Sequence, residues 1–162
     1  MTATETEPGV TTTNTTTLLT HIALPVGDFD ATLAFYAKYT NLVVIHDRYN
    51  DETGLRAAWL ANERDRTVEG AARFVIVLLE RTPPTNVDGL EIEEKYGFLT
   101  SISHLGLSVD TRDDVDRIAE MAREDGCLLL GPLYRNEIVG YICVVKDPDG
   151  NNLEFSVDQV LG

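Results

Sequence analysis

Two of the three histidines in the sequence begin short segments with the same alternating pattern. His21 begins HIALPV and His104 begins HLGLSV, and in both segments every second residue, starting directly after the histidine, is a large aliphatic one. In a strand this alternation places the histidine on the face opposite the apolar side chains. The segment NLEFSV (152–157) alternates in the same way and places Glu154 on the polar face of a third strand.

Two imidazoles and one carboxylate on one sheet face are the ligands of an open divalent-metal site. They suit iron, manganese, nickel, zinc or cobalt, and three protein ligands leave positions for water and for a small-molecule substrate. An ion that holds two adjacent substrate oxygens stabilises a developing enolate or alkoxide, which serves proton transfer, epoxide opening or, with iron, dioxygen chemistry. The alternative is that the three residues are ordinary polar strand residues. The recurrence of histidine in equivalent places favours the metal.

Such chemistry also needs a general base. Glu154 could serve if it leaves the metal, and Glu80 and His46 are further candidates, although a solvated histidine at a strand end is the simpler interpretation of His46. Tyr141, at the end of a segment (131–141) that could line a substrate cavity, is also a candidate catalytic residue. The single tryptophan, Trp59, is expected in the core because large aromatic side chains are mostly buried.

The elements that must position these residues form an internal repeat of strand, helix and three strands. In the first copy Asp28 begins a helix with Phe29, Leu33, Tyr36 and Ala37 on one face. In the second copy Thr111 and Asp114 form a capping box, and Gly126 ends a helix with Val115, Ile118, Ala119 and Ala122 on one face. The expected strands after the helices are 42–47, 56–61 and 73–80, then 127–131, 140–147 and 152–157.

The repeat predicts an α+β fold of two paired βαβββ modules. Residues 1–17 are Thr-rich and predict a disordered tail, 18–80 the first module, 81–100 a linker and 101–162 the second module. The chain has 162 residues, with 27 acidic against 13 basic side chains and a net charge of −14. That charge argues against nucleic-acid or anionic-membrane partners, and two cysteines are too few for a disulfide scaffold. A cytoplasmic location is expected.

Three stretches together, HIALPVGDFDATLAFY, SHLGLSV and DPDGNNLEFS, resemble the vicinal oxygen chelate superfamily. Its members include glyoxalase I, bleomycin- and fosfomycin-resistance proteins, methylmalonyl-CoA epimerase and extradiol dioxygenases. The resemblance covers roughly residues 18–158. It implies two βαβββ modules whose sheets curl around a metal and ligand cavity, within one chain or across a homodimer. It also implies that His21, His104 and Glu154 are the metal ligands.

The sequence departs from the patterns of particular members. Val77 stands where glyoxalase I and the epimerase have a fourth ligand, unless a shifted register brings in Glu80. Val144 and Ala23 stand where fosfomycin enzymes have a tyrosine and a threonine. Neither member's pattern is matched in full, and the best functional hypothesis is a small-molecule metalloenzyme, a glyoxalase-like or related lyase or isomerase. The alternatives are an iron-dependent extradiol-type dioxygenase and a metal-free, ligand-sequestering protein of the bleomycin-resistance type.

Overall fold

The computed structural model describes residues 19–51, 54–63, 74–80, 85–87, 90–92 and 99–160. The predicted tail, 1–17, lies outside these residues. The first half of the chain forms β1 (His21–Val26), α1 (Phe29–Tyr39), β2 (Leu42–Asn50), β3 (Leu55–Asn62) and β4 (Val75–Glu80). The second half forms β7 (Leu105–Ser108), α2 (Arg112–Glu124), β8 (Leu128–Asn136), β9 (Gly140–Lys146) and β10 (Asn152–Val157). Between them β5 (Thr85–Val87) pairs with β6 (Leu90–Ile92), so the expected connector contains a short hairpin.

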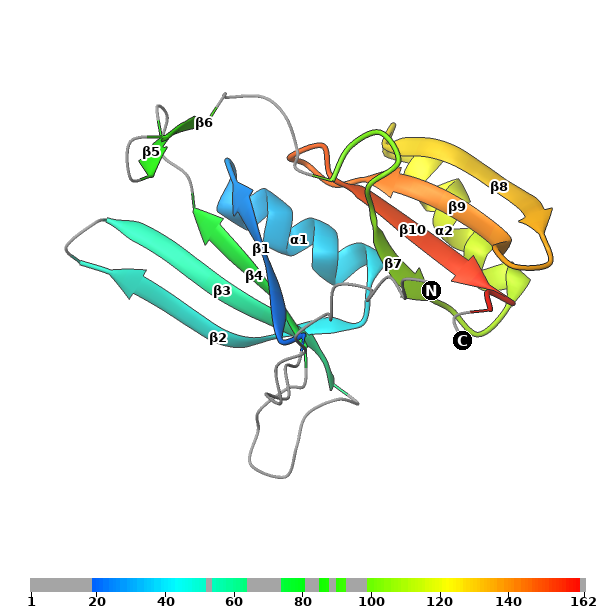
Figure 1. The fold of residues 1–162 in the computed structure, drawn as a ribbon, viewed down its shortest axis with the longest axis horizontal. Helices are drawn as coiled ribbons and strands as arrows, with labels where there is room; N and C mark the ends of the chain where they lie inside the picture. Colours follow the sequence, from blue (N-terminus) through cyan, green and yellow to red (C-terminus); the bar gives the residue numbers. More distant parts are fainter. Residues whose placement is uncertain are drawn as a thin grey trace, which may run out of the picture.

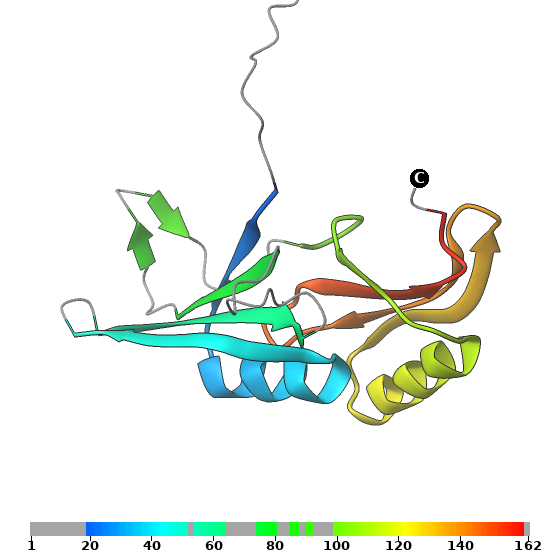
Figure 2. The ribbon, with the colours of Figure 1, turned by 90° about the horizontal axis from the view of Figure 1, so that it is seen from below.

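Each half forms one four-stranded sheet (Figure 1). The strand orders are β1-β4-β3-β2 and β7-β10-β9-β8, and in both sheets the first strand runs parallel to its neighbour while the others are antiparallel. This confirms the prediction of two βαβββ modules. Both helices lie on the same side of the molecule, beneath their sheets in the view of Figure 2. The opposite face of each sheet, called here the open face, carries no helix in the described part of the chain.

The first helix begins where Asp28 predicts, because its carboxylate accepts a hydrogen bond from the Ala31 backbone N–H at 3.0 Å. Its buried face differs from the prediction. Thr32 is buried and Ala37 is exposed, although apolar periodicity alone favours the reverse. Thr32 can be buried because its hydroxyl has a hydrogen-bond partner in the second module.

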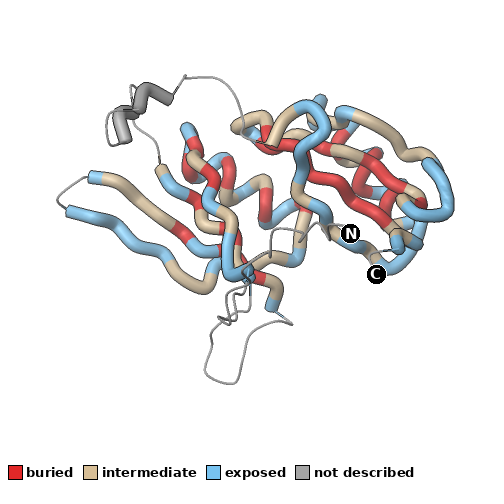
Figure 3. The backbone as a smooth tube through the Cα atoms, in the orientation of Figure 1, coloured by how far each residue is buried: buried red, intermediate tan, exposed pale blue. Residues whose placement is uncertain are grey.

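The second helix agrees with the prediction in detail. The Thr111–Asp114 capping box is present, and the four residues expected on the apolar face are the buried ones: Val115, Ile118, Ala119 and Ala122. Gly126 has a φ of 74°, which glycine adopts readily at a helix C-terminus. Apolar side chains of α2 pack against β9 and β10, where Figure 3 shows much of the buried backbone.

Strand bounds differ from the predicted ones mainly at the sheet edges. β2 and β8 continue to Asn50 and Asn136, because their polar far ends still pair with β3 and β9. β7 begins at Leu105, so His104 immediately precedes the strand. The expectation for Trp59 was wrong: it lies on the open face and is 39% exposed.

The β9–β10 turn of the second module contacts the start of α1 in the first. The Asp149 carboxylate accepts hydrogen bonds from the Gly27 N–H at 2.7 Å and the Thr32 hydroxyl at 2.9 Å. The buried Tyr36 hydroxyl donates to Asp147 at 3.4 Å, and burial raises the pKa of both groups. The predicted DPDG turn is thus also a contact between the two modules.

The other end of α1 makes a second contact of this kind. Lys38 Nζ lies 2.5 Å from Asp125 Oδ2, and the Tyr39 hydroxyl donates to the same oxygen. These two bonds hold the pKa of the Asp125 carboxyl below its usual range, and the bond from Lys38 has the larger effect. Among the described residues, no helix is long and apolar enough to cross a membrane.

Candidate metal centre

His104 and Glu154 lie together on the open face of the second sheet. Glu154 is on β10, opposite Gly106 of β7, and its side chain is only 9% exposed. Its Oε2 lies 3.8 Å from Nε2 of His104. The other ring nitrogen of His104, Nδ1, lies 2.8 Å from the Ile102 carbonyl oxygen. Since a carbonyl only accepts, Nδ1 donates a hydrogen to it, and Nε2 faces the carboxylate.

This arrangement fits two ligands of one divalent ion. Bonds of about 2.0–2.2 Å to a common ion place a nitrogen and an oxygen roughly 3–3.5 Å apart, so a small movement closes the pair around a metal. A histidine whose second nitrogen donates to a backbone carbonyl is also the usual state of a metal-bound imidazole. The donor set, one imidazole nitrogen and one carboxylate oxygen, suits the metals expected from the sequence.

His21 lies elsewhere, at the start of β1 on the open face of the first sheet. It is exposed, and its Nδ1 is 3.0 Å from the Thr20 hydroxyl. In the described part of one chain, no three histidine, cysteine or acidic side chains are close enough to hold a metal. The two sheets lie side by side with separate open faces (Figures 1 and 2), so a single chain does not bring His21 to the His104–Glu154 pair.

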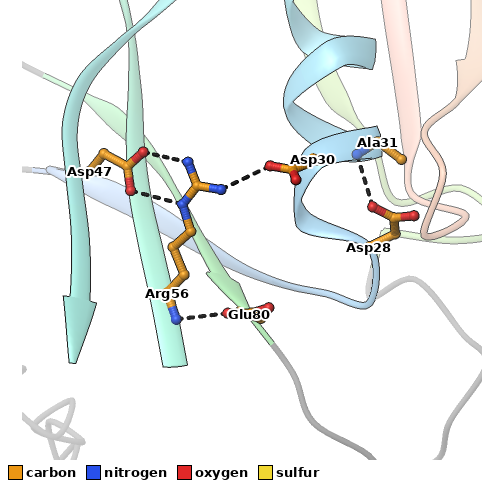
Figure 4. Close-up of polar contacts among 6 residues, drawn as sticks. All are labelled: Asp28, Asp30, Ala31, Asp47, Arg56 and Glu80. Atoms are coloured by element: carbon orange, nitrogen blue, oxygen red, sulfur yellow. Dashed lines mark hydrogen bonds and ion pairs between the residues drawn. The ribbon is translucent and has the colours of Figure 1, made fainter. Parts of the chain in front are cut away.

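The strand register shows what takes the place of a fourth ligand. In the second sheet Gly106 pairs with Glu154, and at the equivalent place in the first sheet Ala23 pairs with Val77. Val77 therefore occupies the position of Glu154, as the sequence indicates, without a register shift. Glu80 faces the other side of the strand and accepts a hydrogen bond from the Arg56 N–H at 2.9 Å (Figure 4).

Arg56 itself belongs to an ion-pair cluster on the helix side of the first module. Its guanidinium binds Asp47 of β2 and Asp30 of α1 at 2.6–2.8 Å (Figure 4). The hydrogen bonds from Arg56 lower the pKa of Asp47. This cluster joins α1 to the sheet and lies on the face opposite His21.

His46 shares the open face with His21 but lies at the other edge of the sheet. The paired row runs from His46 through Trp59 and Val77 to Ala23, so three strand spacings, about 14 Å, separate its ends. The His46 ring packs against Trp59 with centroids 4.6 Å apart. It is a half-buried histidine within β2, not the solvated strand-end residue suggested by the sequence.

Tyr141 lies on the helix side of β9. It pairs with Val157, whereas Glu154 pairs with Val144 on the open face. Its hydroxyl donates to Asp116 of α2 at 2.6 Å, which raises the pKa of the phenol. The structure thus separates Tyr141 from the His104–Glu154 pair, and the catalytic role suggested by the sequence gains no geometric support.

Comparison with known proteins identifies the family. The model of the Glyoxalase/Bleomycin resistance protein/Dioxygenase superfamily matches residues 18–155. The chain belongs to this superfamily. It is 35% identical over 144 residues to the uncharacterized protein PA2024 of Pseudomonas aeruginosa, covering 89% of this chain and 91% of that protein.

Solved structures show the same fold. The fosfomycin resistance protein FosX from Listeria monocytogenes is similar with a TM-score of 0.63 and 18% identity, over 91% of this chain and 97% of that one. A mutant of glyoxalase I from Zea mays is similar with a TM-score of 0.60 and 20% identity, over 85% of this chain and 44% of that one. At these identities the likeness supports the superfamily fold.

Sequence reasoning missed one residue beside the pair. Gln159, the only glutamine of this superfamily member, lies beyond β10 and its amide nitrogen is 3.2 Å from Oε1 of Glu154. No periodicity or motif marks it, because the contact depends on how the chain turns after β10. The sole sequence signal is a long polar side chain five residues after a candidate ligand.

A cleft of about 630 Å³ lies between the two modules. Residues of both modules line it, apolar ones such as Leu60 and Phe155 together with charged ones such as Arg117. None of the predicted metal ligands lines it. The candidate centre is therefore on the open faces and not in this cleft.

Proposed function

We propose that this protein is a metal-dependent enzyme acting on a small molecule, with lyase or isomerase chemistry of the glyoxalase type. The observation that carries the proposal is the His104–Glu154 pair, in which a hydrogen bond from Nδ1 to the Ile102 carbonyl holds the ring with Nε2 3.8 Å from a carboxylate oxygen. FosX, a structural neighbour, has been crystallised with Mn(II) and a dihydroxypropylphosphonic acid, which supports a divalent metal and a small ligand on this fold.

His21, His104 and Glu154 would hold the ion, as predicted from the sequence. When bound, the ion would supply Lewis acidity toward two adjacent substrate oxygens. Oε2 of Glu154 and Nε2 of His104 would bind it from the second module. For the general base, Glu154 and His46 are the candidates on the open faces, whereas Glu80 faces the other side of its sheet and is bonded to Arg56.

We also propose a homodimer in which His21 of the partner subunit completes the ligand set. One chain keeps His21 on a different sheet from the other two ligands, so two open faces from different chains must meet to form a three-ligand site. Trp59 and Leu79 are apolar side chains on the open face of the first module and are 39% and 42% exposed. Their exposure supports the proposal that a partner subunit covers this face. Both cysteines are free, which is compatible with the proposed cytoplasmic location.

The decisive measurement is the metal content of protein purified without chelator, for the wild type, His104→Ala and His46→Ala. We expect the wild type and His46→Ala to retain a divalent ion and His104→Ala to lose it. His46→Ala is the matched control because it removes an imidazole from an open face without touching the ligand set. A folded wild type that neither retains nor rebinds any divalent ion would refute the proposal and favour ligand sequestration.

The identity of the ion then separates the enzymatic alternatives. With iron, oxygen uptake in the presence of catechols tests the dioxygenase alternative. With nickel or zinc, turnover of a glutathione hemithioacetal tests the glyoxalase type. Each substrate is assayed with His104→Ala as the blank.

Subunit mixing tests the shared site. When His21→Ala and His104→Ala chains are refolded together, half of the dimers are mixed, and each mixed dimer contains one complete ligand set. About a quarter of the wild-type metal content should return. If each chain builds its own site, the mixture binds no more metal than the separate variants.

A further inference from the structure

The two oxygens of the Glu154 carboxylate have different neighbours. Oε1 accepts a hydrogen bond from Nε2 of Gln159 at 3.2 Å, while Oε2 faces Nε2 of His104. The side chain is 9% exposed, so bulk water has little access to replace either neighbour. One oxygen is thus occupied by the protein, and the other points to the candidate ligand.

The orientation of the Gln159 amide is determined by its two partners. The Ser156 hydroxyl lies 3.2 Å from Oε1 of Gln159 and can donate to it. An ionised carboxylate only accepts, so the NH₂ group of the amide must face Glu154. Ser156 and Glu154 project from the same face of β10, and the Gln159 side chain bridges them in a directional chain from hydroxyl to amide to carboxylate.

The backbone after β10 holds Gln159 in this place. Asp158 has a φ of 63°, a left-handed conformation that turns the chain back toward the open face. The Val160 N–H then donates to the Ile138 carbonyl at 2.9 Å, which ties the segment to the β8–β9 hairpin. Gln159 is therefore followed by a residue whose backbone is bonded to the β8–β9 hairpin.

We propose that Gln159 is a positioning residue for the metal centre: its amide holds Oε1 of Glu154 and leaves Oε2 as the single oxygen that binds the ion. The inference rests on the proposed function, since it needs an ion at Glu154. Without the amide, the carboxylate can rotate and offer both oxygens. The ion then binds a carboxylate that is not oriented beforehand, which weakens binding. Outer-shell partners of metal ligands typically contribute about 10–100-fold to metal affinity.

The test is a Co²⁺ titration of metal-free, full-length protein, followed by visible absorption, for the wild type, Gln159→Met and Asp158→Asn. Methionine keeps the length of the side chain but has no N–H group. Asp158→Asn is the matched control, because asparagine accepts the left-handed backbone and the position does not touch Glu154. Thermal unfolding of the metal-free proteins is measured in parallel.

We expect Gln159→Met to bind Co²⁺ at least about 10-fold more weakly than the wild type, with altered band intensity as the carboxylate changes from one bound oxygen to two. The control should match the wild type, and the metal-free unfolding temperatures should agree. Equal affinity of Gln159→Met and the wild type would overturn the role of Gln159, and so would a weaker affinity matched by loss of the metal-free fold. If the wild type itself binds no Co²⁺, the metal site fails and the positioning role fails with it.

Discussion

Replacement of Asp149 by alanine should loosen the contact between the two modules. Its carboxylate accepts from the exposed Gly27 N–H at 2.7 Å and from the Thr32 hydroxyl at 2.9 Å. Thr32 is fully buried, so water cannot replace the carboxylate as the hydrogen-bond acceptor of its hydroxyl. Gly27 is exposed, and water can replace that bond.

The expected cost follows from this difference in burial. A hydrogen bond to a charged acceptor contributes about 1.5–3 kcal/mol, and a buried donor left unpaired costs about 1–3 kcal/mol. With most of the loss at Thr32 and a smaller one at Gly27, Asp149→Ala should lower the free energy of unfolding by about 2–4 kcal/mol. Thr32→Val removes the same bond from the other side and should cost about 1–2 kcal/mol.

Urea unfolding at neutral pH, followed by circular dichroism and by fluorescence of the single tryptophan, measures these values. The double variant should cost less than the sum of the single ones by about 1–2 kcal/mol, because both remove one shared bond. Glu137→Ala, at an exposed position in the β8–β9 turn, is the control and should stay within about 0.5 kcal/mol of the wild type. An Asp149→Ala variant as stable as this control, or strictly additive costs, would refute the reasoning.

Three further predictions concern pH, backbone and the phenol. Lys38 and Tyr39 lower the pKa of Asp125. The contact of Asp125 therefore stabilises the fold fully above the unfolded carboxyl pKa of about 4, and this stabilisation is lost as the pH falls through the lowered pKa of the folded protein. The stability difference between the wild type and Asp125→Asn should therefore vanish in acid; a difference constant down to about pH 2 would contradict this. A Cβ at Gly140 (φ 77°) would collide with the Val157 carbonyl, whereas one at Gly126 (φ 74°) meets nothing within 4 Å. In urea unfolding, Gly140→Ala should lower the free energy of unfolding by at least about 3 kcal/mol and Gly126→Ala by about 1 kcal/mol. Equal losses would show that the left-handed backbone alone, and not the collision, determines the loss of stability. Finally, Tyr141→Phe should leave the Co²⁺ affinity unchanged, because the hydroxyl faces Asp116 on the helix side. A tenfold loss of Co²⁺ affinity would show that Tyr141 acts at the metal site.

Strand alternation made the faces of the candidate ligands predictable. A period of two places His104 and Glu154 opposite the apolar side chains whatever the rest of the fold does. The capping box of α2 and its buried face were also predictable, because residue spacing within the helix determines both. The burial of Thr32 was not, since it depends on a carboxylate contributed by the other module.

By itself, the sequence determined the repeat, the α+β class and the residue types on each open face, because these follow from local periodicity. Only the tertiary structure decided which of these residues meet. It brings His104 within 3.8 Å of Glu154, sets Gln159 behind the carboxylate and keeps His21 on a separate sheet. The first depends on the parallel pairing of β7 with β10, the second on how the chain turns after β10 and the third on how the two modules are arranged. None of these leaves a periodic signal in the order of residues.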